Sequence, residues 1–279
     1  MSFRASLRLL LSGIAGSLVL AGALLLLSAA SEPTSASASD LFVSVAGVGN
    51  ACTQSDPCSL GTALDEALDY DSLFLAGGTY TGTDQSVVTL TKHLALFGGW
   101  DGSAGPLQRD AEAYPTSLSG EGERRVVYVA EGVSVTLDGL RLVEGWTSDK
   151  GGGIYGALGS HTTVSGCMIT HNHASSSGAG AHFRGNATIK GSEIAHNTAT
   201  GNGGGIVLIM NHGTTLAANQ IHDNSGFWGG GVMTFKSDAT LVNNDIYSNS
   251  AVDSGGGANI NETDANAVVL SGNRIFSNT

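Results

Sequence analysis

The clearest pattern along the chain is a pair of aliphatic residues five positions apart, followed three positions later by an asparagine. Five copies keep this spacing: Val164/Ile169/Asn172, Ile189/Ile194/Asn197, Leu216/Ile221/Asn224, Leu241/Ile246/Asn249 and Leu270/Ile275/Asn278. The segments are short, bounded by Gly and Asn, and rich in Thr, Val and Ile, whereas a helix would place apolar residues three and four positions apart. The pattern therefore predicts short β-strands.

Glycine motifs repeat with nearly the same period. GGG begins at residues 151, 203, 229 and 255 and GAG at residue 178, so the successive intervals are 27, 25, 26 and 26 residues. A period of this size is typical of a solenoid, and one strand-rich turn per repeat favours stacking of coil on coil. A left-handed helix of hexapeptides would prefer multiples of six, so we predict a right-handed parallel β-helix with about 26 residues per coil.

Stacking assigns a role to each repeated position, because equivalent residues of successive coils lie about 4.8 Å apart. The second aliphatic residues, from Ile169 to Ile275, are expected to form one stripe of the core. The asparagines are expected to form a ladder of hydrogen bonds between side chains at a turn.

The N-terminal part of the β-helix needs protection from edge pairing. Residues 39–92 are expected to form a cap and the first coil, and residues 93–279 the β-helix proper. An amphipathic helix is predicted to cover the core, from the spacing of Leu60, Ala63, Leu64, Ala67 and Leu68. The sequence stops at Asn278-Thr279, at the end of an IxxN motif, so we expect an uncapped C-terminal coil.

The first 38 residues have the features of a secretory signal. Arg4 and Arg8 precede an apolar run over residues 9–27, and Ala36-Ser37-Ala38 suits a cleavage site. Without cleavage the run is long enough to serve as a membrane anchor, the one membrane contact that we expect. In both cases the remainder is exported, so the predicted location is secreted or cell-surface.

Export permits a disulfide, and the sequence offers one pairing. Cys52 and Cys58 are close together, and Asp56-Pro57 between them favours a turn. Cys167 remains without a partner and is expected to be a small buried residue.

The net charge of the chain excludes one class of binding partner. The 279 residues carry 12 Lys and Arg against 24 Asp and Glu, a net charge of −12, which argues against nucleic acid. Glycans and calcium are left open, and no other cofactor is expected.

Two columns of the stack carry candidate catalytic groups. Glu193 and Asp245 lie two coils apart, roughly 9.6 Å by strand spacing, at the upper edge for an inverting glycosidase. A second column places Glu144 above His171 and His196 above Asp223. Both columns also fit an ordinary solvated surface, and no metal site is predicted, because a straight ladder separates its first and third members too widely for zinc.

Aromatic side chains offer another interpretation. Trp146, Tyr155 and Trp228 could stack on sugar rings, or could simply cover loops and core ends. We name these three as candidate binding residues.

The combination of CTQSDPCSLGTALDEAL, LFLAGGTYTG and the GGGI and IxxN repeats resembles exported bacterial right-handed β-helix proteins of the pectin-lyase-like superfamily. The GGGI and IxxN pairs are also similar to the GGAI and FxxN repeats of polymorphic outer-membrane proteins. The resemblance implies the architecture, whereas the superfamily includes lyases, glycosidases and adhesins. Its lyases use carboxylates that bind calcium together with a basic residue, and no compact acidic cluster stands in one column here.

We therefore predict a secreted or cell-surface β-helix with a non-catalytic binding, adhesive or structural role, and an extracellular glycan or cell-surface component as its partner. The alternative is a polysaccharide lyase or glycoside hydrolase that acts on an extracellular glycan.

Overall fold

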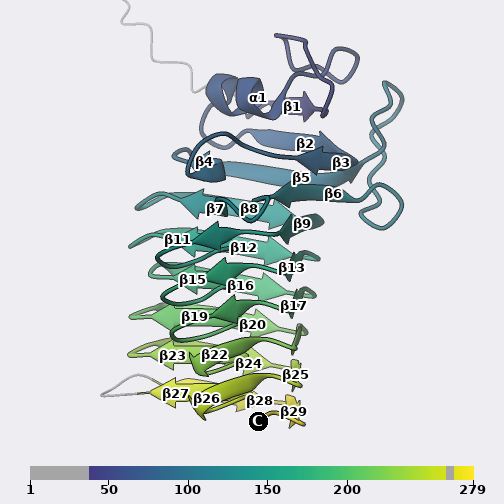
Figure 1. Cartoon of the computed structure of the whole chain (residues 1–279). Coiled ribbons are helices and arrows are strands. Elements are labelled where there is room, and N and C mark those ends of the chain that lie inside the picture. Colours follow the sequence, from purple (N-terminus) through teal and green to yellow (C-terminus); the bar gives the residue numbers. More distant parts are fainter. Residues whose placement is uncertain (1–37, 262–266) are drawn as a thin grey trace, which may run out of the picture. The chain divides into compact units, whose positions relative to one another are not determined.

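The computed structural model describes residues 38–261 and 267–279, which belong to one compact unit that begins at Ala38. The predicted signal peptide, apart from its last residue, lies outside the described residues. In the described segments no helix has the length and apolar character needed to cross a membrane. The unit is a parallel β-helix, so the predicted fold is confirmed (Figure 1).

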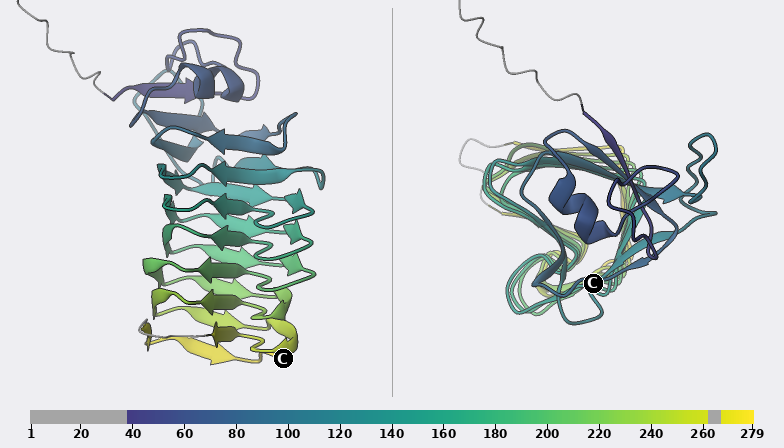
Figure 2. Two further views of the ribbon diagram at one scale, coloured as in Figure 1. Left: turned by 90° about the vertical axis from the view of Figure 1, so that its left-hand side faces the viewer. Right: turned by 90° about the horizontal axis from the view of Figure 1, so that it is seen from above.

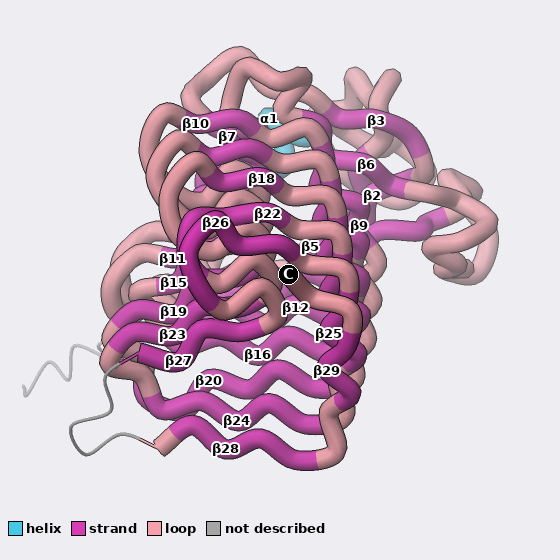
Figure 3. The backbone as a smooth tube through the Cα atoms, turned by 60° about the horizontal axis from the view of Figure 1, so that its bottom comes forward, coloured by secondary structure: helices cyan, strands magenta, loops and turns pink. Residues whose placement is uncertain are grey.

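In residues 38–261 and 267–279, four parallel sheets run along the stack of coils, and a full coil passes through sheets 1 to 4 in turn (Figure 3). Sheet 1 has nine strands: β1 (Asp40–Val43), β2 (Ser72–Ala76), β5 (Leu94–Trp100), β8 (Ser134–Asp138), β12 (His161–Ser165), β16 (Asn186–Lys190), β20 (His212–Ala217), β24 (Asp238–Val242) and β28 (Val268–Ser271). Sheet 2 has eight strands: β3 (Gly78–Tyr80), β6 (Thr116–Ser119), β9 (Leu140–Val143), β13 (Met168–Thr170), β17 (Glu193–Ala195), β21 (Gln220–His222), β25 (Asp245–Tyr247) and β29 (Arg274–Phe276).

The other two sheets are shorter. Sheet 3 has five strands: β10 (Trp146–Thr147), β14 (His173–Ala174), β18 (Thr198–Ala199), β22 (Ser225–Trp228) and β26 (Ser250–Ser254). Sheet 4 has seven strands: β4 (Ser86–Leu90), β7 (Arg125–Val129), β11 (Ile154–Gly156), β15 (Ala181–Phe183), β19 (Ile206–Ile209), β23 (Val232–Phe235) and β27 (Ala258–Asn261).

The register agrees with the repeat. Ile169 pairs with Ile194, Ile194 with Ile221, Ile221 with Ile246 and Ile246 with Ile275, all in parallel strands. The first aliphatic residues stack in the same way in sheet 1, from Leu137 through Val164 to Leu270. Ile169, Ile194, Ile221 and Ile246 are fully buried, so this stripe forms one wall of the core.

The repeated asparagines form a continuous ladder where sheet 2 turns into sheet 3. Each side-chain amide nitrogen donates to the side-chain oxygen of the next asparagine at 2.9–3.0 Å, from Asn172 through Asn197, Asn224 and Asn249 to Asn278. The same nitrogen donates to a carbonyl of the preceding coil, as Asn224 does to Ile194 at 2.8 Å. The ladder thus satisfies polar groups that the turn buries.

A second ladder, which the sequence analysis missed, closes the corner between sheets 1 and 2. Asn219 donates to Asn244, and Asn244 to Asn273, both at 2.9 Å. Towards the N-terminus the same position is held by Ser192 and then Cys167: the Cys167 backbone N–H donates to Ser192 Oγ at 3.1 Å, and the Leu140 N–H donates to Cys167 Sγ at 3.4 Å. Cys167 is therefore a member of a polar ladder as well as a small buried residue.

The first glycine of each triplet has a positive φ, between 62° and 74° at residues 151, 178, 203, 229 and 255. A β-carbon there would also press on an outward side chain of sheet 4, such as His182 at Gly178 or Met233 at Gly229. Glycine therefore lets the loop between sheets 3 and 4 fold back over sheet 4, where Val207 and Met233 are buried.

Helix α1 (Leu60–Glu66) lies over the N-terminal end of the stack (Figure 2). Ser59 Oγ caps it by accepting from the Thr62 N–H, and the Lys92 ammonium group donates to the carbonyls of Leu64, Asp65 and Ala67 at its other end. Leu60, Ala63 and Ala67 are buried, but the prediction for Leu68 was wrong. Leu68 is 56% exposed, because the helix ends at Glu66 and the Asp71 carboxylate accepts from the Leu68 N–H.

Cys52 and Cys58 form a disulfide beside this cap, with their α-carbons 4.6 Å apart. At the other end of the described chain the apolar side chains of the last coil are partly exposed, including Leu270 at 46% and Ile275 at 47%.

Candidate functional site

The candidate column that contains Glu144, His171, His196 and Asp223 lies at a strained turn. All four have φ between 52° and 58°, and Ser248 and Ser277 continue the column with φ 53°. This left-handed conformation ends each strand of sheet 2 and turns the side chain outward, so the four candidate side chains are exposed. The four residues therefore do form a column, and their side chains face solvent.

The structure gives the upper members of the column different partners from those expected. Glu144 accepts a hydrogen bond from Ser119 Oγ at 2.7 Å, and His171 Nδ1 hydrogen-bonds with its neighbour Thr170 at 2.8 Å. His171 also stacks on His196, with 5.1 Å between the ring centroids.

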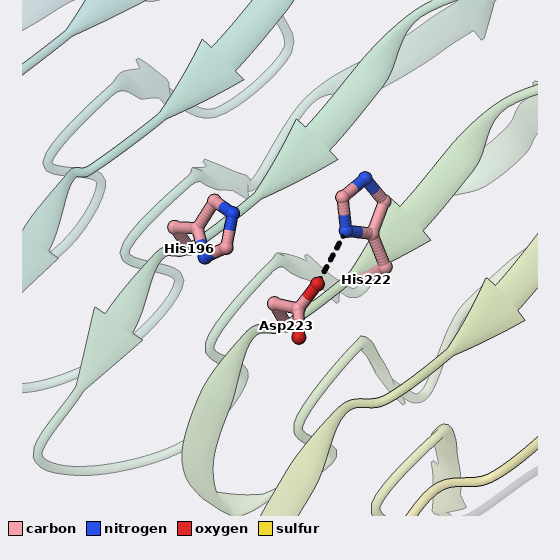
Figure 4. A group of neighbouring side chains, drawn as sticks. All are labelled: His196, His222 and Asp223. Carbon is pink, nitrogen blue, oxygen red and sulfur yellow. Dashed lines mark hydrogen bonds and ion pairs between the residues drawn. The ribbon is translucent and has the colours of Figure 1, made fainter.

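His222 is the centre of the lower part of the column. Its Nδ1 lies 2.7 Å from Asp223 Oδ2, and its Nε2 lies 3.2 Å from Glu193 Oε1. The ring is held edge to face against His196 at 5.9 Å and stacks flat on Tyr247 at 4.7 Å. Figure 4 shows the rings of His196 and His222 on neighbouring coils, with the carboxylate of Asp223 bonded to His222. The sequence offers His222 and Asp223 as a base and the group that orients it, but the position of His222 varies between the repeats, so His222 was not among the predicted site residues. In the structure its register partners are Ala195 and Tyr247.

Glu193 and Asp245 do not face each other as a catalytic pair would. They lie on β17 and β25 with Gln220 of β21 between them in the register. Glu193 contacts His222, and Asp245 lies 3.3 Å from the guanidinium of Arg274.

Two of the three candidate binding aromatics meet in one cleft. Trp146, at the start of sheet 3, and Tyr155, in sheet 4, line a cavity of about 510 Å³ together with Tyr128. Tyr128 and Tyr155 stack with centroids 5.6 Å apart, and the Trp146 side chain is 40% exposed. We call this cavity the aromatic cleft. Trp228 lies outside it, three strands further along sheet 3, where its indole N–H donates to the Asp253 carboxylate.

Arg125 contacts both tyrosines of the aromatic cleft. Its guanidinium lies over the rings of Tyr155 and Tyr128, at 5.2 and 5.7 Å from their centroids, and donates to the carbonyls of Gly151 and Lys150. Burial lowers the pKa of Arg125, while the charge of Asp149 acts in the opposite direction. Arg125 and Tyr128 were not predicted, because they belong to a coil without a glycine triplet.

A second cavity, of about 670 Å³, follows on the same face. His182, which stacks on Tyr155 at 5.6 Å, lines it together with Lys150 and Arg184. Burial lowers the pKa of His182 to about 3, with the nearby charge of Lys150 adding to the shift. The stack from Tyr128 through Tyr155 to His182 thus joins the two cavities along the axis of the β-helix.

Charges in the aromatic cleft balance. Arg124 and Arg125 face Glu123 and Asp149, and Arg124 forms ion pairs with Glu121 and Glu123 at 2.6 and 2.7 Å. The cleft therefore combines aromatic surface with paired polar groups and has no excess of either charge.

Comparison with known proteins supports the architecture. The family model for the right handed beta helix region matches residues 126–279, more than half of the chain. Searches among curated proteins and among solved structures gave no match. The match agrees with the predicted handedness and with the stacked parallel sheets, and the chain belongs to the right-handed β-helix family.

Proposed function

We propose that this protein is an exported β-helix that binds a neutral polysaccharide in the aromatic cleft, without cleaving it. The observation that carries the proposal is the convergence of Trp146, Tyr128 and Tyr155 with hydrogen-bonding side chains in one cavity. The C–H faces of a sugar ring pack on aromatic rings, and its hydroxyl groups bond to polar side chains around them.

The charge of the cleft favours a neutral ligand. Two arginines balance two carboxylates there, whereas the whole chain carries a net charge of −12. A uronate polymer would be repelled by the protein as a whole and would find no surplus of cations in the cleft. The neighbouring cavity beside His182 extends the surface along the axis, which suits a polymer of several sugar units. Arg184 and Lys150 line this cavity, and Lys150 is paired with Asp149 at 3.4 Å.

A catalytic role has less support. The two candidate catalytic carboxylates already have partners: Glu193 contacts His222, and Asp245 contacts Arg274. Glu144 accepts a hydrogen bond from Ser119. The alternative of a polysaccharide lyase or glycoside hydrolase remains the second candidate, on the resemblance to the pectin-lyase-like superfamily.

A screen on polysaccharides distinguishes a protein that binds them from an enzyme that cleaves them. Affinity electrophoresis of the purified chain in gels containing neutral polysaccharides or uronate polymers, with and without calcium, should show retardation by a neutral polymer only. The same mixtures should release no reducing ends and no unsaturated products that absorb in the ultraviolet. Such products, or retardation by uronate polymers alone, would overturn the proposal.

A further inference from the structure

Both ring nitrogens of His222 face a carboxylate. Asp223 Oδ2 lies 2.7 Å from Nδ1, and Glu193 Oε1 lies 3.2 Å from Nε2. Ligand histidines in metal sites are commonly oriented in this way, by a carboxylate at the ring nitrogen that does not bind the ion.

His196 supplies a further ligand on the same side. The ligand atoms of His196, His222 and Asp223 all lie within 4.8 Å of one another (Figure 4). We propose that these three side chains bind a divalent transition metal ion, with Zn²⁺ as the ion that the donor set fits. Imidazole nitrogen and carboxylate oxygen are ordinary zinc ligands.

Glu193 orients the ring of the central ligand, His222. When its carboxylate accepts the Nε2 proton of His222, the other ring nitrogen faces Asp223 and is free to bind the ion. A carboxylate behind a ligand histidine fixes the tautomer and strengthens the metal bond. The His222 side chain is only 12% exposed and is held by Tyr247 and His196, so the central ligand is already positioned.

The geometry requires small movements only. Neighbouring ligand atoms of a tetrahedral zinc ion are about 3.3 Å apart, so gaps of up to 4.8 Å must close by no more than about 1.5 Å, and the 2.7 Å between His222 Nδ1 and Asp223 Oδ2 must open by about 0.6 Å. His196 and Asp223 are exposed and can make this adjustment. A straight ladder of single residues could not converge on one ion, but the side-by-side His222 and Asp223 place two ligands on one coil.

Isothermal titration of the full chain with Zn²⁺ tests the proposal. We expect one ion per chain, and weakening of the Kd by about tenfold or more in both His222→Gln and His196→Gln, because each removes a ligand. His212→Gln is the matched control, since His212 forms a similar exposed pair with Asp238, at 3.0 Å, and no third ligand joins that pair among the described residues. His196→Gln changes an exposed side chain and tests the site even if His222→Gln fails to fold. Absence of binding at millimolar Zn²⁺, or equal affinity in the His196 and His212 variants, would overturn the proposal.

Binding of Co²⁺ gives a second readout. Visible absorption typical of tetrahedral cobalt is expected for the wild-type chain and for His212→Gln, and not for His196→Gln. A spectrum that all three proteins share would contradict the site.

Discussion

The side-chain amide of Asn224 lies directly against Gly205, so close that a β-carbon at residue 205 would come within 3.2 Å of it. The same contact recurs in the other coils, between Gly153 and Asn172, Gly180 and Asn197, Gly231 and Asn249, and Gly257 and Asn278. The two strongest motifs of the sequence share a period because the third glycine of each triplet makes room for the asparagine ladder.

Gly205→Ala should destabilise the fold strongly. The added methyl group would overlap the Gly231 carbonyl oxygen as well as the Asn224 amide, and overpacking of this kind costs about 1–3 kcal/mol or more. Urea unfolding followed by circular dichroism measures the loss. Gly191→Asn is the control: residue 191 has φ 55° with open space around it, and asparagine tolerates this conformation, so the change should stay within about 1 kcal/mol. Equal effects of the two substitutions would contradict the packing argument.

Asn224→Ala should break the ladder. Asn224 donates to Asn249 and to the Ile194 carbonyl and accepts from the Asn197 amide groups. Each buried group left unpaired costs about 1–3 kcal/mol, so we expect a loss of roughly 3 kcal/mol or more by urea unfolding. Asn243→Gly changes an exposed asparagine with φ 53° that lies outside both ladders and should be nearly neutral. A mild effect at residue 224 would mean that the ladder contributes little.

Cys167 should accept serine better than valine. Serine can take its place in the second ladder, as Ser192 does one coil further on, so Cys167→Ser should stay within about 1 kcal/mol of wild type. Cys167→Val leaves the Leu140 N–H without its acceptor and should cost about 1–3 kcal/mol more than serine. Thermal and urea unfolding of both variants decide between this role and that of a plain apolar residue, for which valine would be the better substitute.

His182 should make stability depend on pH. Its pKa is about 3 in the folded chain and near 6.5 in the unfolded chain, so the unfolded state binds one more proton between these values. Stability is therefore complete well above pH 6.5 and falls as the pH decreases towards 3, by about 1.6 kcal/mol between pH 6.5 and 5. Urea unfolding across this range should give a smaller slope for His182→Asn than for wild type. The exposed His161→Asn should keep the wild-type slope, and the same slope in all three proteins would refute the assignment.

The fold was predictable because the repeat fixes the register. Once Ile169, Ile194 and Ile221 recur at constant offsets from an asparagine, stacking them is the arrangement that buries them all and pairs the amides. The second ladder escaped notice because Cys167, Ser192 and Asn219 share a position but no residue type. Their common property, a side-chain atom able to accept a hydrogen bond from the coil before, becomes visible only when the coils are aligned in space.

The candidate site was predictable in part. Trp146 and Tyr155 were selected as aromatic residues, but their convergence with Tyr128 and Arg125 depends on the path of the loop between sheets 3 and 4. The repeated glycines allow that loop to fold back, and residue spacing does not show which side chains it brings together. The His196–His222–Asp223 cluster likewise depends on the His222 ring, which contacts both His196 and Asp223. Side-chain direction at a left-handed turn follows from backbone geometry that residue spacing alone does not supply.

Titration of matched tryptophan variants with the neutral polysaccharide that retards the chain tests the functional account most directly. Trp146→Ala removes the exposed ring from the aromatic cleft and should weaken binding about tenfold or more, a loss of roughly 1.4 kcal/mol. Trp228→Ala removes a ring of the same kind outside the cleft and should keep the wild-type Kd within about twofold. Equal affinity of the two variants, or a larger loss in Trp228→Ala, would contradict binding in the aromatic cleft.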